Sequence, residues 1–325
     1  MNVLFVSSGN TKYGINPIVK AQGESLSNAG INIEYLTITG KGVISYLKSS
    51  RQIREYVKNN NVDLIHAHYT LSGWSSVLAC TGKPIVLSLM GSDAYGSYVG
   101  ENKIKYSSLY LIILTIMIQI FVNRIICKSR NIENIVYVKN KSHVIPNGVC
   151  LDNIKDNRIS YRGELLLHSS KKYILFLGSK MNVRKNYQLA YSASKLLANE
   201  DIELIAPYPV VHEQVYKYLN SVDCLIVTSF MEGSPNVVKE AMACNCPIVA
   251  TDVGDIKWLF GNTPGCYISK FTPMDISNKI KMALNYTQQF VKTNGRDRII
   301  EIGLDADTVA KKIIEVYENT IDNNK

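Results

Sequence analysis

The residues best suited to chemistry in this sequence are two glutamates, Glu232 and Glu240, which flank a Gly-Ser-Pro turn. Ser234 is predicted to be the N-cap of a helix with Pro235 in its first turn, and the first turn of a helix offers free N–H groups and a positive dipole end. Such an end binds anions, phosphates in particular. A carboxylate beside a bound phosphate is repelled by it, so we expect both glutamates to accept hydrogen bonds from the neutral hydroxyls of a sugar or a ribose. The pattern therefore predicts a site for a nucleotide sugar.

The segments around the two glutamates decide between this site and a pair of solvated surface carboxylates, which an isolated pair at this spacing would more often be. Cys224–Thr228 and Pro247–Thr251 are short apolar runs rich in β-branched residues, as is typical of buried strands. Pro235–Ala243, between them, is predicted to be a helix. The glutamates therefore belong to one β-loop-α-β unit and flank its anion site.

The segment EGSPNVVKEAMACNCPIVATDVGD, residues 232–255, resembles the donor-site motif of family 4 glycosyltransferases, which are retaining enzymes of the GT-B fold. It is close to the version found in bacterial capsule and surface-polysaccharide members. The resemblance implies that Glu232 lies against the donor sugar and acts in catalysis, and that Glu240 binds the ribose. It also implies that the loop amides hold the sugar and the diphosphate, a role that falls to Gly233, Ser234, Pro235 and Asn236.

A second loop resembles the glycine loop and the phosphate-binding lysine of the same family. The predicted strand Tyr173–Leu177 leads into GSKMNVRKNYQLAYSASKLL, in which Gly178 matches the glycine and Lys185 best matches the lysine. Lysine is a compact, mobile cation that can follow a diphosphate as negative charge builds on the leaving group. The family usually has an arginine directly after the glycine, so Lys180 is a second candidate for phosphate contact and Arg184 could substitute. Without the resemblance, any one lysine in this loop would more often be a solvated surface residue.

The acceptor side is expected at three loops that follow predicted strands, Ser7–Ile15, His66–Tyr69 and Met90–Tyr95, since open α/β sheets bind ligands at the carboxyl ends of their strands. The segments DLIHAHYTLSGW and PIVLSLMGSDAYG resemble the matching parts of the family. The resemblance implies an acceptor-side role for Gly14, His68, Gly91 and Asp93.

Two features of these loops bear on activity. Many family members have a histidine where this chain has Met90, and a methionine cannot make the polar contact to the transferred sugar that a histidine would make. His66 and His68 are expected to point to opposite faces of the sheet, so that one faces the cleft and the other the packing of the sheet. Two purely structural histidines are an equal alternative.

The elements that position these loops follow from the alternation of strands and helices in the first half. The predicted strands are Asn2–Val6, Ile31–Ile38, Val62–Ala67, Pro84–Leu89, Arg124–Lys128 and Ser142–Pro146. The predicted helices are Ile15–Asn28, Val43–Asn59, Leu71–Cys80, Ile104–Val122 and Asn131–Val138. This alternation predicts a doubly wound parallel sheet. No GxGxxG follows the first strand, which disfavours a dinucleotide-dependent oxidoreductase.

The length of 325 residues and the 46% hydrophobic content suit two domains. We place their boundary in the polar, irregular segment Cys150–Lys172. The prediction is an N-terminal acceptor-side domain of residues 1–165, a donor domain of residues 166–305, and a C-terminal helix of residues 306–325 that, by the resemblance, packs back on the N-terminal domain. The expected fold class is α/β, with two Rossmann-like doubly wound parallel sheets facing each other across a cleft, as in GT-B. The donor base pocket is expected near Glu203–Ser221.

Cysteine use and charge limit the environment and the partners. The seven cysteines are odd in number and scattered, without the spacing of a zinc site, which indicates a reducing compartment. The N-terminus is predicted to be a strand rather than a signal peptide, so we expect a cytoplasmic protein. Residues 1–165 hold 18 Lys and Arg against 10 Asp and Glu, whereas residues 166–325 hold 18 against 17. Without a basic run interleaved with aromatics, this surplus favours an anionic membrane surface over nucleic acid.

Ser107–Asn123 contains no charged residue and reaches only the lower length limit of a membrane-spanning helix. A span here would interrupt the predicted sheet. An ordinary helix on a sheet buries one stripe, but nearly every face of this segment is apolar. Peripheral contact with the inner face of the cell membrane is therefore favoured over a wholly buried helix, and with it a lipid-linked acceptor.

The predicted reaction is transfer of a hexose-type sugar from a nucleoside diphosphate sugar to a hydroxyl of a saccharide or polyprenyl-linked saccharide, with retention at the anomeric carbon. No metal and no cofactor are required, since the cations and the helix N-terminus can neutralise the diphosphate. A role in capsule or other surface-polysaccharide synthesis follows from the resemblance. Two alternatives stay open: a nucleotide-sugar epimerase of the same fold and a non-catalytic GT-B partner subunit.

Overall fold

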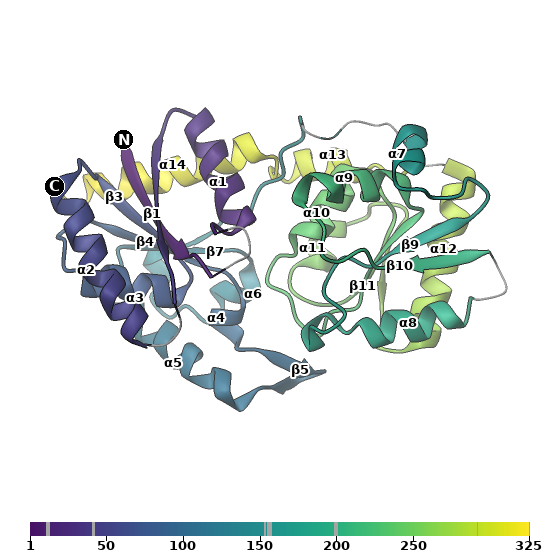
Figure 1. Cartoon of the computed structure of the whole chain (residues 1–325), viewed down its shortest axis with the longest axis horizontal. Helices are drawn as coiled ribbons and strands as arrows, with labels where there is room; N and C mark the ends of the chain where they lie inside the picture. Colours follow the sequence, from purple (N-terminus) through teal and green to yellow (C-terminus); the bar gives the residue numbers. More distant parts are fainter. Residues whose placement is uncertain are drawn as a thin grey trace. The chain divides into compact units, whose positions relative to one another are not determined.

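The computed structural model of the chain describes residues 1–10, 14–40, 43–152, 154, 158–197, 201–290 and 292–324. Residues 11–13 of the predicted acceptor-side loop, and residues 153 and 155–157 of the predicted domain boundary, lie outside these ranges. The chain divides into two compact units (Figure 1). Unit 1 is made of residues 1–97, 105–148 and 306–325, and unit 2 of residues 98–104 and 149–305.

Unit 1 is built on a six-stranded parallel sheet in the order β2-β1-β3-β4-β7-β8. Its strands are β1 (Asn2–Ser8), β2 (Asn32–Ile38), β3 (Leu64–His68), β4 (Ile85–Leu89), β7 (Arg124–Cys127) and β8 (Ser142–Val144). Its α-helices are α1 (Pro17–Asn28), α2 (Val43–Asn59), α3 (Thr70–Leu78), α4 (Ser92–Tyr95), α5 (Leu109–Ile118), α6 (Arg130–Glu133) and α14 (Ala306–Asp322). Two short 3-10 helices are η1 (Tyr106–Ser108) and η2 (Lys139–Lys141).

Unit 2 is built on a five-stranded parallel sheet in the order β10-β9-β11-β12-β13. Its strands are β9 (Lys172–Leu175), β10 (Ile202–Ile205), β11 (Cys224–Val227), β12 (Ile248–Thr251) and β13 (Cys266–Ser269). Its helices are α7 (Arg158–Glu164), η3 (Val183–Lys185), α8 (Tyr187–Lys195), α9 (His212–Ser221), α10 (Asn236–Ala243), α11 (Ile256–Phe260), α12 (Pro273–Phe290) and α13 (Gly295–Glu301). The hairpin β5 (Tyr98–Gly100) and β6 (Lys103–Ile104) belongs to this unit, where β5 packs against η3.

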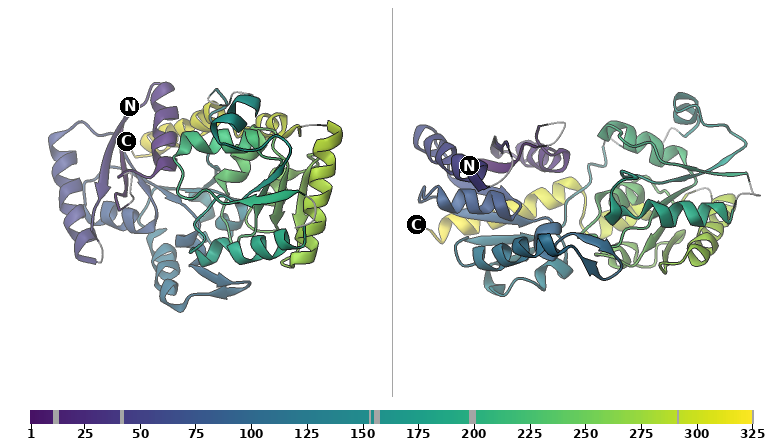
Figure 2. Two further views of the ribbon diagram at one scale, coloured as in Figure 1. Left: turned by 45° about the vertical axis from the view of Figure 1, so that its right-hand side comes forward. Right: turned by 60° about the horizontal axis from the view of Figure 1, so that its bottom comes forward.

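Both sheets are covered by helices on two faces, which is why their central strands are buried and mostly apolar. In unit 1, α2 packs on α3 and α3 on α5, whereas α1 packs on α14 (Figure 2). In unit 2, α8 packs on α12, whereas α9 packs on α7 and α10. The central strands β3, β4, β11 and β12 are buried along their whole length. The two doubly wound parallel sheets predicted from the sequence are therefore confirmed.

The structure differs from the sequence prediction at the junction of the units. The main segment of unit 2 begins at Val149, directly before the predicted boundary segment Cys150–Lys172, whereas the predicted N-terminal domain extends to residue 165. Residues after Val149 join unit 2 because Val149 N donates to the carbonyl of Leu304 and α7 packs on α9. The C-terminal helix α14 lies in unit 1, where His66 Nδ1 is 2.5 Å from Tyr317 Oη.

The predicted helix Ile104–Val122 is shorter in the structure. Its first residues form β6 and η1, and α5 covers only Leu109–Ile118. A uniformly apolar segment carries no periodic signal of where a helix begins, so the start was wrong by several residues. Among the described residues, no helix combines the length and hydropathy needed to cross a membrane.

Candidate functional site

The candidate site lies in unit 2, where the strand order reverses between β9 and β11. In open α/β sheets such a reversal leaves a crevice at the carboxyl ends of the two strands, and ligands bind there. The loop after β9 contains Gly178 and Lys185, and the loop after β11 contains Glu232. Topology therefore brings together two segments that lie far apart in the sequence.

Glu232 is buried and holds two cations from the β9 loop. Arg184 Nη1 lies 2.7 Å from Glu232 Oε2, and Lys185 Nζ lies 2.7 Å from Oε1. Ser229 Oγ donates to the same Oε1 at 2.7 Å. The charged side chains of Arg184, Lys185 and Glu232 together carry one net positive charge.

The ionisation of Glu232 depends on these neighbours. Burial acts to raise the pKa of Glu232, but the charges of Lys185 and Arg184, and the hydrogen bonds from Lys185 and Ser229, lower it to about 2. Glu232 is therefore a carboxylate at neutral pH even though it is removed from water.

The β9 loop is fastened to the β11 loop by backbone contacts. Phe230 N donates to the carbonyl of Arg184 at 2.8 Å, and Arg184 Nη1 also donates to the carbonyl of Met231 at 2.8 Å. A Cβ on Gly178 would lie 3.3 Å from Lys185 Cγ, so this glycine leaves room for the lysine stem. Gly178 and Lys185, which the sequence assigned to one phosphate-binding loop, therefore lie next to each other in the structure.

Lys180 and Arg184 were alternative candidates for a second phosphate contact. The structure places Arg184 on Glu232, as described above. Lys180 is exposed, and its Nζ lies over the ring of Tyr187 at 5.0 Å from the ring centroid. Arg184 is therefore the better placed of the two for a ligand bound beside Glu232.

Helix α10 begins directly after the loop Gly233-Ser234-Pro235, so its N-terminus faces the same region as Glu232. The prediction that Ser234 is the N-cap is wrong. Pro235 takes the N-cap position with an extended backbone, and no side chain caps the helix. Ser234 Oγ instead accepts a hydrogen bond from Lys239 Nζ at 3.2 Å. Asn236 is the first helical residue and is partly exposed.

Lys239 and Asp255 are buried charged residues close to the loop Gly233-Ser234-Pro235, and neither was predicted to be a site residue. Lys239 is fully buried; burial lowers its pKa to about 8, although Asp255 and Glu240 act to raise it. Burial raises the pKa of Asp255 to about 6 against the opposing effect of Lys239. Next to Asp255, a Cβ on Gly254 would lie only 2.6 Å from the carbonyl oxygen of Gly233, so this position accepts only glycine.

Glu240 lies in α10 and is paired with a residue that was not predicted from its motif. His212 Nε2 is 2.8 Å from Glu240 Oε1, and the His212 ring packs edge-on against Tyr216 at 5.3 Å. Burial and the nearby charge of Glu240 raise the pKa of Tyr216. The only sequence signal for His212 is that it begins the helix in the segment where the base pocket was expected.

In unit 1, Asp93 organises the loop after β4. Its carboxylate is fully buried and accepts hydrogen bonds from the backbone N–H groups of Met90, Gly91 and Thr70 at 2.9–3.2 Å. Burial raises the pKa of Asp93 to about 6, against the effect of the hydrogen bonds from Gly91 and Met90. Gly91 has a φ of 122°, which suits a glycine. Gly14 is exposed with a φ of 70°. The acceptor-side roles of these residues stay predictions.

The expectation that His66 and His68 point to opposite faces is wrong, because residues two apart in a strand share a face. Their rings lie 4.2 Å apart, and His68 packs on Phe5 at 4.5 Å. His66 is fully engaged by Tyr317 and by Ser88 Oγ, which lies 2.8 Å from Nε2. Both ring nitrogens of His68 are buried and find no hydrogen-bond partner among the described residues. Burial lowers the pKa of both histidines well below the usual value.

Two further observations concern metals and thiols. The described residues contain no group of three or more His, Cys, Asp or Glu side chains placed to hold a metal ion. All seven cysteines lie in described parts of the chain and are free thiols.

Comparison with known proteins gives two family matches and two relatives. Residues 21–153 match the model "Glycosyltransferase Family 4", and residues 200–286 match "Glycosyl transferases group 1". The chain is 27% identical to the uncharacterized glycosyltransferase MJ1178 of Methanocaldococcus jannaschii over 78% of this chain and 74% of that protein. It is 24% identical to TuaC of Bacillus subtilis, named as a teichuronic acid biosynthesis glycosyltransferase, over 61% of this chain and 55% of that protein.

Two solved structures share the fold. Sucrose-phosphate synthase from Thermosynechococcus elongatus aligns with a TM-score of 0.81 at 16% identity, covering 99% of this chain and all of that one. Anabaena HepE in complex with UDP-glucose aligns with a TM-score of 0.71 at 16% identity, covering 98% of this chain and all of that one. These likenesses confirm the GT-B fold expected from the sequence. Together with the family matches and the two relatives, they identify the chain as a glycosyltransferase of the GT-B fold.

Proposed function

We propose that the chain is a retaining glycosyltransferase that moves a sugar from a nucleoside diphosphate sugar to a hydroxyl of a saccharide acceptor. One observation carries this proposal. Arg184 and Lys185 meet the buried Glu232 at the N-terminus of α10, at the reversal point of the unit 2 sheet. Two mobile cations and a helix N-terminus at one place suit a diphosphate.

In this proposal the cations do the work of a metal ion. When the diphosphate binds, Lys185 and Arg184 donate further N–H groups to its oxygens while they stay paired with Glu232, and this attraction strengthens as the leaving group gains charge in the transition state. Glu232 stays ionised and lies against the donor sugar. The reaction then needs no metal, because these two cations and the backbone N–H groups neutralise the diphosphate.

Glu240 is proposed to bind the ribose of the donor. Its carboxylate is mostly buried, and one oxygen is already held by His212 Nε2 at 2.8 Å. A ribose hydroxyl donates to the second oxygen or displaces His212 from the first. The nucleotide thus spans α10, with its diphosphate at the N-terminus and its ribose one to two turns along the helix.

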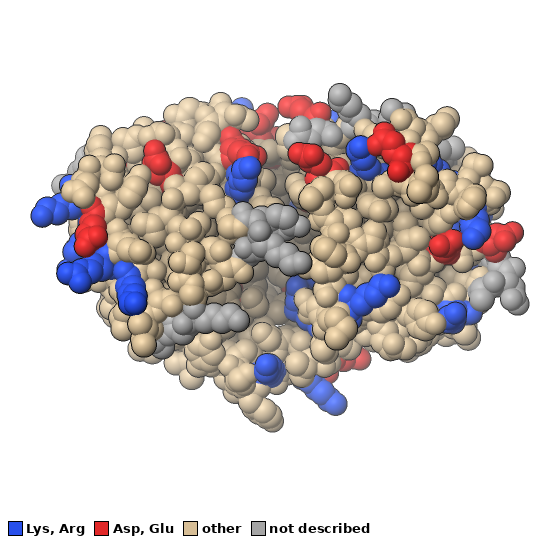
Figure 3. Space-filling model, in the orientation of Figure 1, with Lys and Arg blue, Asp and Glu red and all other residues tan. Residues whose placement is uncertain are grey.

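The acceptor is proposed to be a lipid-linked saccharide in surface polysaccharide synthesis, with the enzyme docked on the inner face of the cell membrane. Support comes from α5, where Ile113 and Ile116 are 58% and 42% exposed. The relative TuaC is named as a glycosyltransferase of teichuronic acid biosynthesis, and this likeness supports a role in polysaccharide synthesis. Figure 3 shows charged side chains of both signs in small groups on one face of the molecule.

A screen of nucleotide sugars by thermal shift, followed by a transfer assay, tests the proposed function. A bound donor raises the unfolding temperature by mass action, so one base and one sugar should stand out. With a saccharide acceptor, the product should keep the anomeric configuration of the donor. Formation of an epimer without acceptor would instead indicate an epimerase, and donor binding without turnover across an acceptor panel would indicate a non-catalytic partner subunit.

A further inference from the structure

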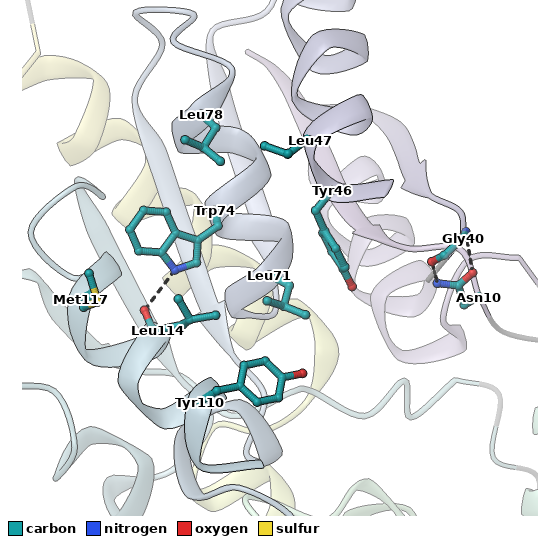
Figure 4. A pocket seen from close by; sticks show the side chains of 10 residues that line it. All are labelled: Asn10, Gly40, Tyr46, Leu47, Leu71, Trp74, Leu78, Tyr110, Leu114 and Met117. Carbon is teal, nitrogen blue, oxygen red and sulfur yellow. Dashed lines mark hydrogen bonds between the residues drawn. The ribbon is translucent and has the colours of Figure 1, made fainter. Parts of the chain in front are cut away.

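Unit 1 contains a cavity of about 690 Å³, which is separate from the candidate site of unit 2. It lies among α2, α3 and α5 and is called here the apolar pocket (Figure 4). Its walls are formed by Asn10, Gly40, Tyr46, Leu47, Leu71, Trp74, Leu78, Tyr110, Leu114 and Met117. A volume of several hundred Å³ is typical of a pocket for a small organic ligand.

The polar groups on the walls of the apolar pocket are largely used up within the protein. Trp74 Nε1 donates to the carbonyl of Leu114 at 3.1 Å, so the indole presents only its apolar surface (Figure 4). Asn10 and Gly40 bond each other twice, at 2.8 and 3.0 Å. Apart from the hydroxyls of Tyr46 and Tyr110, the lining side chains offer hydrocarbon. A sugar or a nucleotide would lose its hydrogen bonds to water in this pocket without replacement.

The apolar pocket is continuous with an exposed apolar surface. Tyr110 and Met117 line it from α5, and the same helix exposes Ile113 and Ile116. The exposed Lys105 lies directly before η1 and α5, and Lys141 Nζ binds the carbonyl groups of Gln119, Ile120 and Val122 at the end of α5. An apolar opening on a helix with a cation near each end complements a molecule with a hydrocarbon chain and an anionic head.

We propose that the apolar pocket binds the hydrocarbon chain of the lipid that carries the acceptor saccharide. This inference rests on the proposed function and adds to it a binding site for one part of the substrate. Chain insertion would hold the acceptor lipid to unit 1 while its anionic head stays among the lysines around α5. The pocket thereby selects acceptors that carry a long apolar chain.

Binding of n-alkyl phosphates below their critical micelle concentrations tests this directly. The chain has two tryptophans, so Trp258→Phe leaves Trp74, inside the pocket, as the reporter of binding by fluorescence. From octyl through decyl to dodecyl phosphate, affinity should rise on the order of tenfold for each added pair of methylenes until the pocket is full. Inorganic phosphate should not change the signal. Equal affinity for all chain lengths, or no binding of dodecyl phosphate, overturns the proposal.

Two residues of α2 give a matched pair of variants. Leu47 lines the pocket and is 53% exposed, whereas Ile44 is 70% exposed and is not among the lining residues. Leu47→Asp should weaken dodecyl phosphate binding tenfold or more, and Ile44→Asp should leave it unchanged. Met117→Phe, which fills the pocket with apolar bulk and adds no second tryptophan, should also weaken binding. If both pocket variants bind like the wild type, the chain does not occupy this cavity.

The outcome separates this inference from the proposed function. The fluorescence titration uses neither donor nor acceptor, so its failure leaves donor binding and transfer to short, water-soluble acceptors unaffected. If the inference holds, Leu47→Asp lowers transfer to a lipid-linked acceptor but not to a short saccharide. A dimer in sedimentation velocity that Leu47→Asp dissociates would assign the pocket to a second copy of the chain and overturn the inference.

Discussion

Glu232 shows how neighbouring charges can hold a buried carboxylate in its ionised form. Arg184 and Lys185 lower its pKa to about 2, below the usual value of 4.5. A carboxylate with a lowered pKa in the folded state contributes stability above its unfolded pKa, and this contribution is lost as the pH falls through the folded pKa.

Glu232→Gln is therefore expected to change the dependence of stability on pH. Between about pH 4.5 and pH 2, the wild type should lose more free energy of unfolding than the variant, because only the wild type must take up a proton at this site. Urea unfolding at a series of pH values measures the difference. Parallel curves for the two proteins would mean that the cations do not stabilise Glu232 in solution.

Lys185 is expected to act in the transition state rather than in donor binding alone. Lys185→Ala should lower kcat by roughly 100-fold or more with a smaller rise in KM, since charge on the leaving diphosphate builds during the reaction. Lys185→Arg should restore little, because a planar guanidinium does not replace a compact ammonium in this space. Lys195→Ala, at an exposed lysine of α8, serves as the control. Unchanged turnover in Lys185→Ala would move the phosphate contact to Arg184 or Lys180.

At this scale the motif predicted the charged residues but not their partners. Glu232, Glu240 and Lys185 were found from local spacing and resemblance. Ser229, His212 and Asp255 were not predicted. Which residues become hydrogen-bond partners depends on the tertiary fold, which places His212 next to Glu240. Ser234 was misassigned because a proline that follows a serine can itself take the N-cap position.

Among the elements, α5 is the helix whose composition least resembles that of a helix covering a sheet. It buries Leu111, Thr115 and Ile118 and leaves isoleucines, leucine and tyrosine exposed on its other faces. The sequence predicted that part of this segment projects from the core, and exposure of Ile113 and Ile116 agrees with that. The start of the helix was beyond prediction, since the hairpin before it leaves no periodic signal.

Ile113→Asp combined with Ile116→Asp should remove salt-resistant binding to anionic vesicles. Apolar side chains that enter the interface contribute about 25 cal/mol per Å² independently of salt, whereas attraction of lysines to anionic lipid is screened. Co-sedimentation at low and high salt separates the two contributions. Ile300→Asp, at a 51% exposed isoleucine of α13, is the matched control. A wild type that ignores vesicles of every composition would remove the support for a membrane-bound acceptor.

At the scale of the whole molecule, alternating strands and helices were enough to predict two doubly wound sheets. The exact junction was not predictable, because the polar segment after residue 149 has no apolar pattern that assigns it to either sheet. Its place in unit 2 depends on long-range contacts such as Val149 N with the carbonyl of Leu304. The return of α14 to unit 1 was expected only from the family resemblance and is secured by Tyr317.

Tyr317→Phe tests how far α14 stabilises unit 1. The variant removes the hydroxyl that lies 2.5 Å from His66 Nδ1 and leaves a buried ring nitrogen unsatisfied. Such a loss costs about 1–3 kcal/mol, so the midpoint of thermal unfolding should fall. Tyr106→Phe, at an 88% exposed tyrosine of the same unit, should unfold like the wild type. Equal midpoints for all three proteins would show that this hydrogen bond adds nothing to the attachment of α14.

The central claim is that α10 and its preceding loop form the nucleotide site, and calorimetric titration of Glu240→Ala with UDP, GDP and ADP tests it most directly. One diphosphate should bind the wild type, and Glu240→Ala should weaken that binding by roughly 10- to 100-fold through loss of ribose hydrogen bonds. Glu213→Ala, at an exposed glutamate of α9, should bind like the wild type. An unchanged dissociation constant in Glu240→Ala, with the fold intact by circular dichroism, would contradict the claim.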